Sequence, residues 1–221
     1  MGDELDLAPA EGFVSEDVRA ELPGLRLDWI SVVARRRDSP RIVKRRLNDL
    51  SSRYRGANAV ALRTQPVPHA YRAFFRQIGL DPDIDRIPSE EAVVARLLHG
   101  GFRSENLIAD ALLISLIETG VPIWAIDAER VQAGGLGIRT SVEGERLGSS
   151  EVSPYLPSER LVVADAGRIQ ALLFGGIAPG HEVTGRTRRV VLFSVGVAGV
   201  PMIHIEEALW VCAEVLSGRE A

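Results

Sequence analysis

The chain has 221 residues, of which 46% are apolar and 25% are charged, and its formal net charge is −4 at pH 7. This composition is ordinary for a globular protein and excludes an intrinsically disordered chain, which has too few apolar residues to form a core. The length allows one substantial core, so a single domain spanning residues 1–221 is predicted.

The amino terminus is acidic and contains no apolar run, so neither a secretory signal nor a transit peptide is predicted, and the expected location is the cytoplasm. The longest apolar stretch, residues 190–203, is interrupted by two glycines and a proline and is too short to span a bilayer. No membrane partner is therefore expected. The lone cysteine, Cys212, lies among valines and an alanine, which indicates a buried structural thiol.

Hydrophobic periodicity and turn residues predict an alternation of helices and strands, which indicates an α/β (α+β) fold. Strands are predicted at 25–34, 59–62, 136–140, 161–164, 169–174 and 190–197, and helices at 40–54, 69–78, 88–98, 106–118 and 205–216.

A basic segment lies between Arg35 and Arg55, where nine basic residues stand against two acidic ones. The segment carries about +7 and the remaining chain about −11. Two interpretations remain open: a face that binds RNA phosphates, since each neutralised phosphate releases counterions, or a solvated helix face with ion pairs to acidic residues elsewhere. The residues expected to contact RNA are Arg41, Lys44, Arg45 and Arg46 in the helix, with Arg86 beside the next helix start.

The four histidines show no spacing typical of metal ligands, so neither a metal nor another cofactor is predicted. His181 and Glu182 lie in a glycine-rich loop and form a pair able to exchange a proton near neutral pH, which makes them the candidate catalytic residues. The alternative is a pair of exposed loop residues without a chemical role. Because no nucleophile motif occurs, water is the expected nucleophile in any hydrolysis.

A series of short motifs follows in a fixed order from about residue 66 to about residue 200. In this order and spacing, the series resembles the tRNA-editing domain (B3/B4 domain) of the phenylalanyl-tRNA synthetase β subunit, and the stand-alone bacterial proteins that carry only this domain. The motifs are Arg86 to Ala92, Gly100-Gly101, Asn106 with Asp110, Gly120 to Asp127, Gly134 to Arg139, Glu143-Gly144-Glu145, Val162 to Asp165, Gly175-Gly176, and Thr187 before Val190.

The resemblance implies a mixed central sheet with flanking helices. It places an editing-domain-like core at 66–200, after an amino-terminal strand and basic helix at 1–65 and before a closing helix at 201–221. It also implies that the chain does not aminoacylate tRNA by itself, because the catalytic motifs of class II synthetases are missing from the sequence.

In the family, this domain hydrolyses mischarged tyrosyl-tRNA in a polar pocket that reads the tyrosine hydroxyl. The polar positions of that pocket are apolar in this chain. A site that reads a hydroxyl depends on buried polar groups that only the right substrate satisfies, so their loss disfavours tyrosine. The pocket is then either an apolar site for another aminoacyl group or small ligand, or a filled core. The family's Thr-Asn pair falls on Leu112 and Leu113, its histidine on Trp124, a backbone-approach glycine on Leu172, and its tyrosine-binding glutamate on Phe193.

Three hypotheses about function follow. The first is a tRNA-binding or RNA-binding relative of the editing domain, acting in trans as an aminoacyl-tRNA deacylase that is not specific for tyrosine. The second is a non-catalytic module for RNA, protein or a small ligand that keeps the fold with a degenerate site. The third is a binder of a small apolar or aminoacyl ligand without RNA, which salt dependence separates from RNA binding. The sequence does not indicate the oligomeric state.

Overall fold

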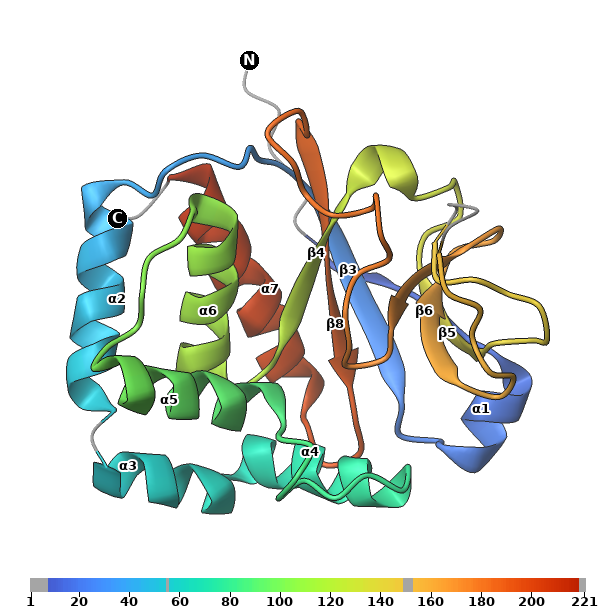
Figure 1. Ribbon diagram of the computed structural model, residues 1–221, viewed down its shortest axis with the longest axis horizontal. Helices are drawn as coiled ribbons and strands as arrows, with labels where there is room; N and C mark the ends of the chain where they lie inside the picture. Colours follow the sequence, from blue (N-terminus) through green and yellow to red (C-terminus); the bar gives the residue numbers. More distant parts are fainter. Residues whose placement is uncertain (1–7, 55, 149–152, 219–221) are drawn as a thin grey trace. The chain divides into compact units, whose positions relative to one another are not determined.

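The computed structural model describes residues 8–54, 56–148 and 153–218. These residues form two compact units, and each unit is built from two separate stretches of chain. The strand unit comprises residues 1–35 and 124–196, and the helical unit comprises residues 36–123 and 197–221. Figure 1 colours the elements of both units by their position in the chain. The predicted acidic amino terminus and the basic residue Arg55 lie outside the described residues.

The first sheet of the strand unit is built around two long strands. β3 (Arg26–Val33) and β8 (Arg189–Gly196) run antiparallel and pair along their whole length. The short strand β1 (Ala10–Glu11) lies outside β3, and β4 (Ile123–Asp127) lies outside β8, in the order β1-β3-β8-β4. Every residue of β8 after Arg189 is buried, which places this strand in the core of the unit.

The second sheet has the order β2-β5-β6-β7 and comprises β2 (Phe13–Val14), β5 (Gly137–Thr140), β6 (Leu161–Ala164) and β7 (Ile169–Leu172). β2 runs parallel to β5, and the other pairs are antiparallel. The approach of β2 to β5 requires glycine at 137, since a Cβ atom there would lie 2.3 Å from the Phe13 ring. The short helices α1 (Glu16–Glu21) and η2 (Ala128–Arg130) complete the unit.

Within the helical unit, α6 is the central helix. Its side chains are apolar on most sides, its start is capped by the Asn106 side chain, and its end is closed by Gly120 in the left-handed conformation. α6 packs against α7, where the Ser115 hydroxyl donates to the Ala208 carbonyl at 2.7 Å. The elements of the unit are α2 (Arg41–Arg53), α3 (Gly56–Ala61), η1 (Leu62–Thr64), α4 (Pro66–Gln77), α5 (Pro88–His99), α6 (Leu107–Thr119) and α7 (Met202–Ser217).

The predicted α+β class is confirmed, with the strands divided between two sheets among the described residues. The strand predicted at 59–62 is wrong, because α3 and η1 occupy this stretch. Two alanines in the run favour a helix, and among its described side chains Val60 and Ala61 are exposed and Leu62 is buried, without the alternation of a strand. In the described ranges, the helices fall short of the length and apolar character needed to cross a bilayer.

The predicted burial of Cys212 is confirmed, since the residue is fully buried in α7. This burial raises the pKa of the Cys212 thiol, so the side chain acts as a small apolar group.

Candidate functional site

An aromatic cluster lies at the edge of the first sheet of the strand unit. Trp124 extends from β4 and Phe193 from the neighbouring strand β8, and their rings stack with centroids 5.6 Å apart and planes inclined by 15°. Phe174 meets Trp124 edge to face, at a centroid distance of 5.6 Å. Such offset and edge contacts contribute about 0.5–1.5 kcal/mol each beyond simple burial. The cluster is therefore a packed apolar surface.

Phe174 holds an unusual backbone conformation in this cluster. Its φ angle is 55°, in the left-handed region, which costs a residue with a Cβ atom about 1–2 kcal/mol. Residues held in such a conformation often mark functional or specifically shaped sites. The contact with Trp124 offsets part of the cost and sets the position of the loop after β7. Phe174 was predicted as the end of a strand at 169–174 and not as a site residue, whereas β7 ends at Leu172 and Phe174 lies in the loop that follows.

The five predicted pocket residues divide between the two units. Trp124, Leu172 and Phe193 belong to the strand unit, where the structure brings Trp124 and Phe193 into contact. Leu172 ends β7 and is half-buried beside Gly175, where a Cβ atom would lie 2.8 Å from that of Leu172. Leu112 and Leu113 belong to the helical unit, on α6, and both are half-buried. Their shared role in one pocket stays a prediction.

A buried polar chain runs from Asp165 through Gln170 to His181 in the strand unit. The Gln170 amide nitrogen donates to Asp165 Oδ2 at 2.7 Å and to the Arg130 carbonyl at 3.0 Å. The Gln170 Oε1 atom lies 2.7 Å from His181 Nδ1. Because this oxygen only accepts hydrogen bonds, His181 Nδ1 carries the proton and Nε2 is the basic nitrogen of the neutral ring. The network thus assigns one tautomer to His181.

Asp165 organises the turn that precedes Gln170. Its Oδ1 atom accepts from the amides of Gly167 and Arg168, at 2.9 and 2.8 Å, and its Oδ2 atom accepts from the amide of Gln132 at 2.9 Å. Burial by itself raises the pKa of the Asp165 carboxyl, but these amides together with Gln170 lower it below its usual value. The carboxylate stays ionised and holds the Gln170 amide in one orientation.

The predicted catalytic pair, His181 and Glu182, occupies two different environments. His181 is only 1% exposed, and burial lowers its pKa, with the positive charges of Arg130 and Arg168 lowering it further. Glu182 is exposed and accepts a hydrogen bond from the Gly180 amide at 2.7 Å. The alternative of two exposed loop residues therefore fits Glu182 and not His181. A catalytic role for the pair stays a prediction.

The buried His181 predicts a specific pH dependence of stability. The unfolded chain takes up a proton at a pKa near 6.5, whereas the folded ring takes it up only at lower pH. As the pH falls through 6.5, wild-type stability should drop relative to His181→Gln, by up to about 1.4 kcal/mol per pH unit, and level off below the folded pKa. Urea unfolding of both proteins between pH 7.5 and 5 measures this difference, because the two proteins differ only at residue 181. If the difference in unfolding free energy between the two proteins did not change with pH, the burial of His181 would be contradicted.

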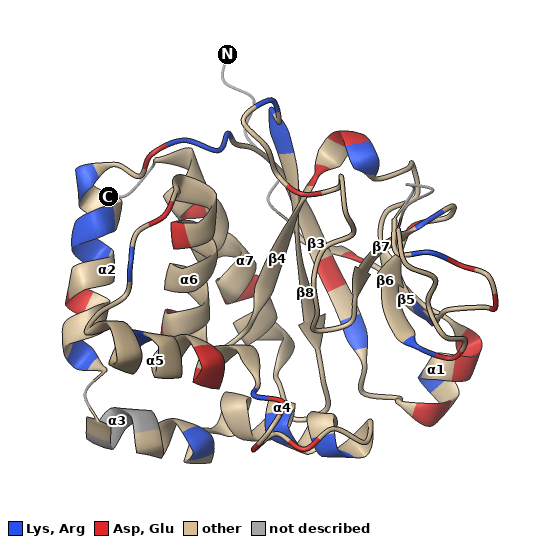
Figure 2. Cartoon of the chain, in the orientation of Figure 1, with Lys and Arg blue, Asp and Glu red and all other residues tan. Residues whose placement is uncertain are grey.

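The basic helix α2 is amphipathic, as predicted. Val43, Leu47 and Leu50 are buried. Arg46, also expected to contact RNA, instead holds Glu118 of α6 with two hydrogen bonds, of 2.9 and 2.6 Å. Figure 2 shows the basic residues along α2. The predicted RNA-contacting residues that are exposed are Arg41, Lys44 and Arg45 on α2, and Arg86 before α5.

Comparison with known proteins gives one family. Residues 70–208 match the B3/4 domain family. The phenylalanine–tRNA ligase beta subunit of Gloeobacter violaceus is 36% identical over 108 residues, which cover 48% of this chain and 14% of that protein. The same subunit of Tropheryma whipplei is 31% identical over 140 residues, 62% of this chain and 14% of that protein. In Neisseria meningitidis, the subunit is 32% identical over 127 residues, 56% of this chain and again 14% of that protein.

Proposed function

Because the chain belongs to the B3/4 domain family, we propose that it binds tRNA and that the exposed face of α2 supplies the phosphate contacts. The matched relatives are named as subunits of a tRNA ligase, and the chain spans about one seventh of their length. This relation supports an RNA partner, but it does not extend to the activity of the whole ligase.

The arrangement of charge on α2 is the observation that carries the proposal. Arg41, Lys44 and Arg45 are exposed. Lys44 and Arg45 follow Arg41 by three and four residues, so all three lie on one face of the helix. Val43 and Leu47 anchor the opposite face in the helical unit. A row of cations on a rigid helix matches the spacing of phosphates along a nucleic-acid backbone better than scattered surface charges do.

We expect Arg41→Glu/Arg45→Glu to weaken the binding of tRNA without an attached amino acid at least about 10-fold at low salt. The slope of log K against the logarithm of the salt concentration should become shallower by about 0.7–0.9 for each lost phosphate contact. Fluorescence anisotropy across a salt series measures both quantities. Arg19→Glu/Arg160→Glu is the matched control, because it changes the net charge equally at two exposed positions of the strand unit. Equal losses in both variants would mean that net charge, and not α2, determines binding.

For the ester chemistry, we propose that the site does not hydrolyse tyrosyl-tRNA. Trp124 and Phe193 stack where the family carries hydrogen-bonding side chains, so a tyrosine hydroxyl finds no matching carboxylate there. A second candidate function, deacylation of another aminoacyl-tRNA, is favoured by one observation: the Gln170 contact leaves His181 Nε2 as the basic nitrogen. This function requires a movement that exposes His181, which is buried.

Deacylation assays on a panel of aminoacyl-tRNAs separate these candidates. Hydrolysis of one non-tyrosyl substrate that His181→Gln abolishes would establish a deacylase. A flat panel together with tRNA binding would establish a binding module with a degenerate site. Hydrolysis of tyrosyl-tRNA would contradict the proposal, and the absence of any tRNA binding would leave the small-ligand hypothesis.

A further inference from the structure

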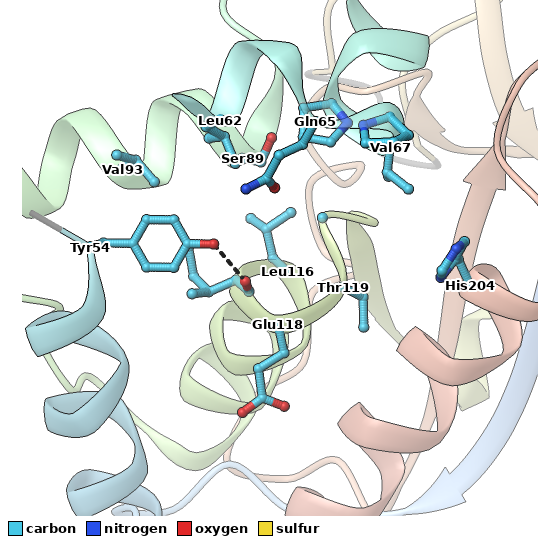
Figure 3. A pocket seen from close by; sticks show the side chains of 14 residues that line it. Tyr54, Leu62, Gln65, Val67, Ser89, Val93, Leu116, Glu118, Thr119 and His204 are labelled. Atoms are coloured by element: carbon cyan, nitrogen blue, oxygen red, sulfur yellow. Dashed lines mark hydrogen bonds between the residues drawn. The ribbon is translucent and has the colours of Figure 1, made fainter. Parts of the chain in front are cut away.

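A pocket of about 260 Å³ opens within the helical unit, whereas the aromatic cluster belongs to the strand unit. It lies between the carboxyl ends of α2 and α6 and the amino ends of α4 and α5, with His204 of α7 on one side (Figure 3). The volume is slightly below the range of about 300–1,000 Å³ typical of small-molecule sites. A pocket of this size is too small for a large ligand but accommodates one small ring system.

Ser89 is the feature that points to a ligand. The residue lines the pocket and is only 3% exposed, and in the described part of the chain its hydroxyl has no hydrogen-bond partner. It lies in the first turn of α5, where no preceding helical carbonyl accepts its proton. A buried hydroxyl left unpaired destabilises the folded chain, because it has lost its hydrogen bonds to water without gaining others. A ligand with a polar atom near Ser89 would remove this cost.

Gln65 supplies a second polar group and Tyr54 an aromatic ring. In Figure 3 the Gln65 carboxamide projects into the same space as Ser89, with the Tyr54 ring beside it. Gln65 precedes α4 without capping it, so its amide is not used by the helix. The Tyr54 hydroxyl is held by the Ile117 carbonyl at 3.1 Å. A carboxamide offers one donor and one acceptor in a plane, the pattern that matches the edge of a base.

The electrostatics of the pocket favour a neutral occupant. At the start of α4, Pro66 and Pro68 remove amide donors that an anion would need. At the start of α5, Glu91 adds negative charge, whereas Glu90 is paired with Arg72. Glu118, which also lines the pocket, is already bound by Arg46. The remaining walls are largely aliphatic, so the chemistry fits a flat, uncharged ring with polar edges.

A basic hollow adjoins this pocket. It measures about 280 Å³, is lined by Arg45, Arg46, Arg53 and the acidic Asp49 of α2, and shares Glu118 with the pocket. Tyr54 directly follows Arg53 at the end of α2. A ring held beside Tyr54 would thus place an attached sugar phosphate near the arginines of α2. This combination of neutral ring and adjacent phosphate is the chemistry of a nucleotide.

We propose that the pocket in Figure 3 binds a nucleobase, with Ser89 and Gln65 contacting its polar edge and Tyr54 its ring. The base belongs either to a free nucleotide or to RNA held on α2, and only the second source rests on the proposed function. This site belongs to the helical unit and offers polar groups, whereas the aromatic cluster belongs to the strand unit and is apolar.

Titration of the ¹⁵N-labelled chain with AMP, GMP, CMP and UMP tests the proposal. At least one nucleotide, at concentrations up to about 10 mM, should shift the Gln65 side-chain amide and the backbone amides of Ser89 and Gly120 in a saturable way. Ribose 5-phosphate, which lacks the base, should not. Ser89→Ala and Gln65→Leu should each weaken binding about 5-fold or more, whereas Ser52→Ala, an exposed serine on α2, should not.

Stability serves as the second readout. Ser89→Ala removes an unpartnered hydroxyl, so its Tm should equal or exceed that of the wild type, and weaker binding cannot then be ascribed to unfolding. If none of the four nucleotides causes localised shifts, or if the shifts persist in both variants, the proposal of a nucleobase site in this pocket is wrong. Nucleotide binding without tRNA binding would support the pocket and contradict the α2 proposal. Binding of an RNA that lacks one loop base distinguishes a base of RNA from a free nucleotide. If this abasic RNA binds more weakly than the intact RNA, the base in the pocket belongs to RNA.

Discussion

Arg72→Ala is expected to lower the free energy of unfolding by about 3–5 kcal/mol, because it leaves a buried carboxylate without its cation. The Arg72 side chain is 7% exposed and that of Glu90 is 5% exposed. Arg72 Nη1 lies 2.9 Å from both Glu90 carboxylate oxygens, and Nη2 lies 2.8 Å from Asp83. The ion pair joins α4 to α5, so its loss affects the packing of the helical unit. Chemical denaturation followed by circular dichroism measures the change.

Two further variants separate burial from charge. Arg72→Met/Glu90→Gln removes both charges while keeping similar side-chain volumes, so it should recover most of the stability lost in Arg72→Ala. Arg63→Ala should cost less than about 1 kcal/mol, because Arg63 is half exposed, its 3.1 Å contact with Asp83 is open to solvent, and its contact with Glu90 is longer, at 3.6 Å, than that of Arg72. If Arg72→Ala and Arg63→Ala had equal effects, the buried pair would not be the origin of the loss.

Glu90 shows what periodicity can and cannot predict. The Pro88-Ser89 start and the terminating glycines predict α5 correctly, because these signals are local. Arg86 was placed beside this helix start as an expected RNA contact, and no partner for Glu90 was predicted. In the structure, Glu90 is buried and pairs with Arg72, while Arg86 is exposed. A pattern along one helix does not state which helix lies opposite.

The sheets illustrate the same limit for strands. β3 and β8 are both predicted from their apolar runs, but their pairing joins Arg26 to Gly196 across most of the chain. β4 was not predicted as a strand, since its five residues alternate too little to be distinguished from a loop. The residues in β4 were nevertheless recognised as a motif. Strand order depends on long-range packing, for which one sequence carries no local signal.

The candidate sites divide in a similar way. Trp124 and Phe193 were predicted to share a pocket from the spacing of family motifs, and in the structure their rings stack, while their role in a pocket stays a prediction. Gln170 had no such signal, because a glutamine within an apolar strand resembles an ordinary surface position of that strand. Its role depends on burial between Asp165 and His181. Ser89 was assigned to a helix start, but its unpaired hydroxyl appears only in three dimensions.

Asp165→Ala is expected to lower the free energy of unfolding by about 2–4 kcal/mol, because it leaves several donors without an acceptor. The carboxylate is 2% exposed and receives the amides of Gln132, Gly167 and Arg168 as well as the Gln170 side chain. The two turn amides can recruit water once the carboxylate is gone, whereas the Gln170 amide is fully buried and cannot. Most of the loss should therefore come from Gln170.

The same substitution should change His181, which Asp165 positions through Gln170. In the wild type, ¹⁵N spectra of the neutral ring should show the proton on Nδ1. In Asp165→Ala the Gln170 amide keeps the Arg130 carbonyl as one acceptor but loses the carboxylate, so its orientation is held less firmly and a mixture of both His181 tautomers is expected. Glu182→Gln is the matched control, since the side chain is exposed and bonds only the Gly180 amide, and it should cost less than about 1 kcal/mol. An unchanged tautomer in Asp165→Ala would show that other contacts orient the His181 ring, and the carboxylate would then stabilise the turn alone.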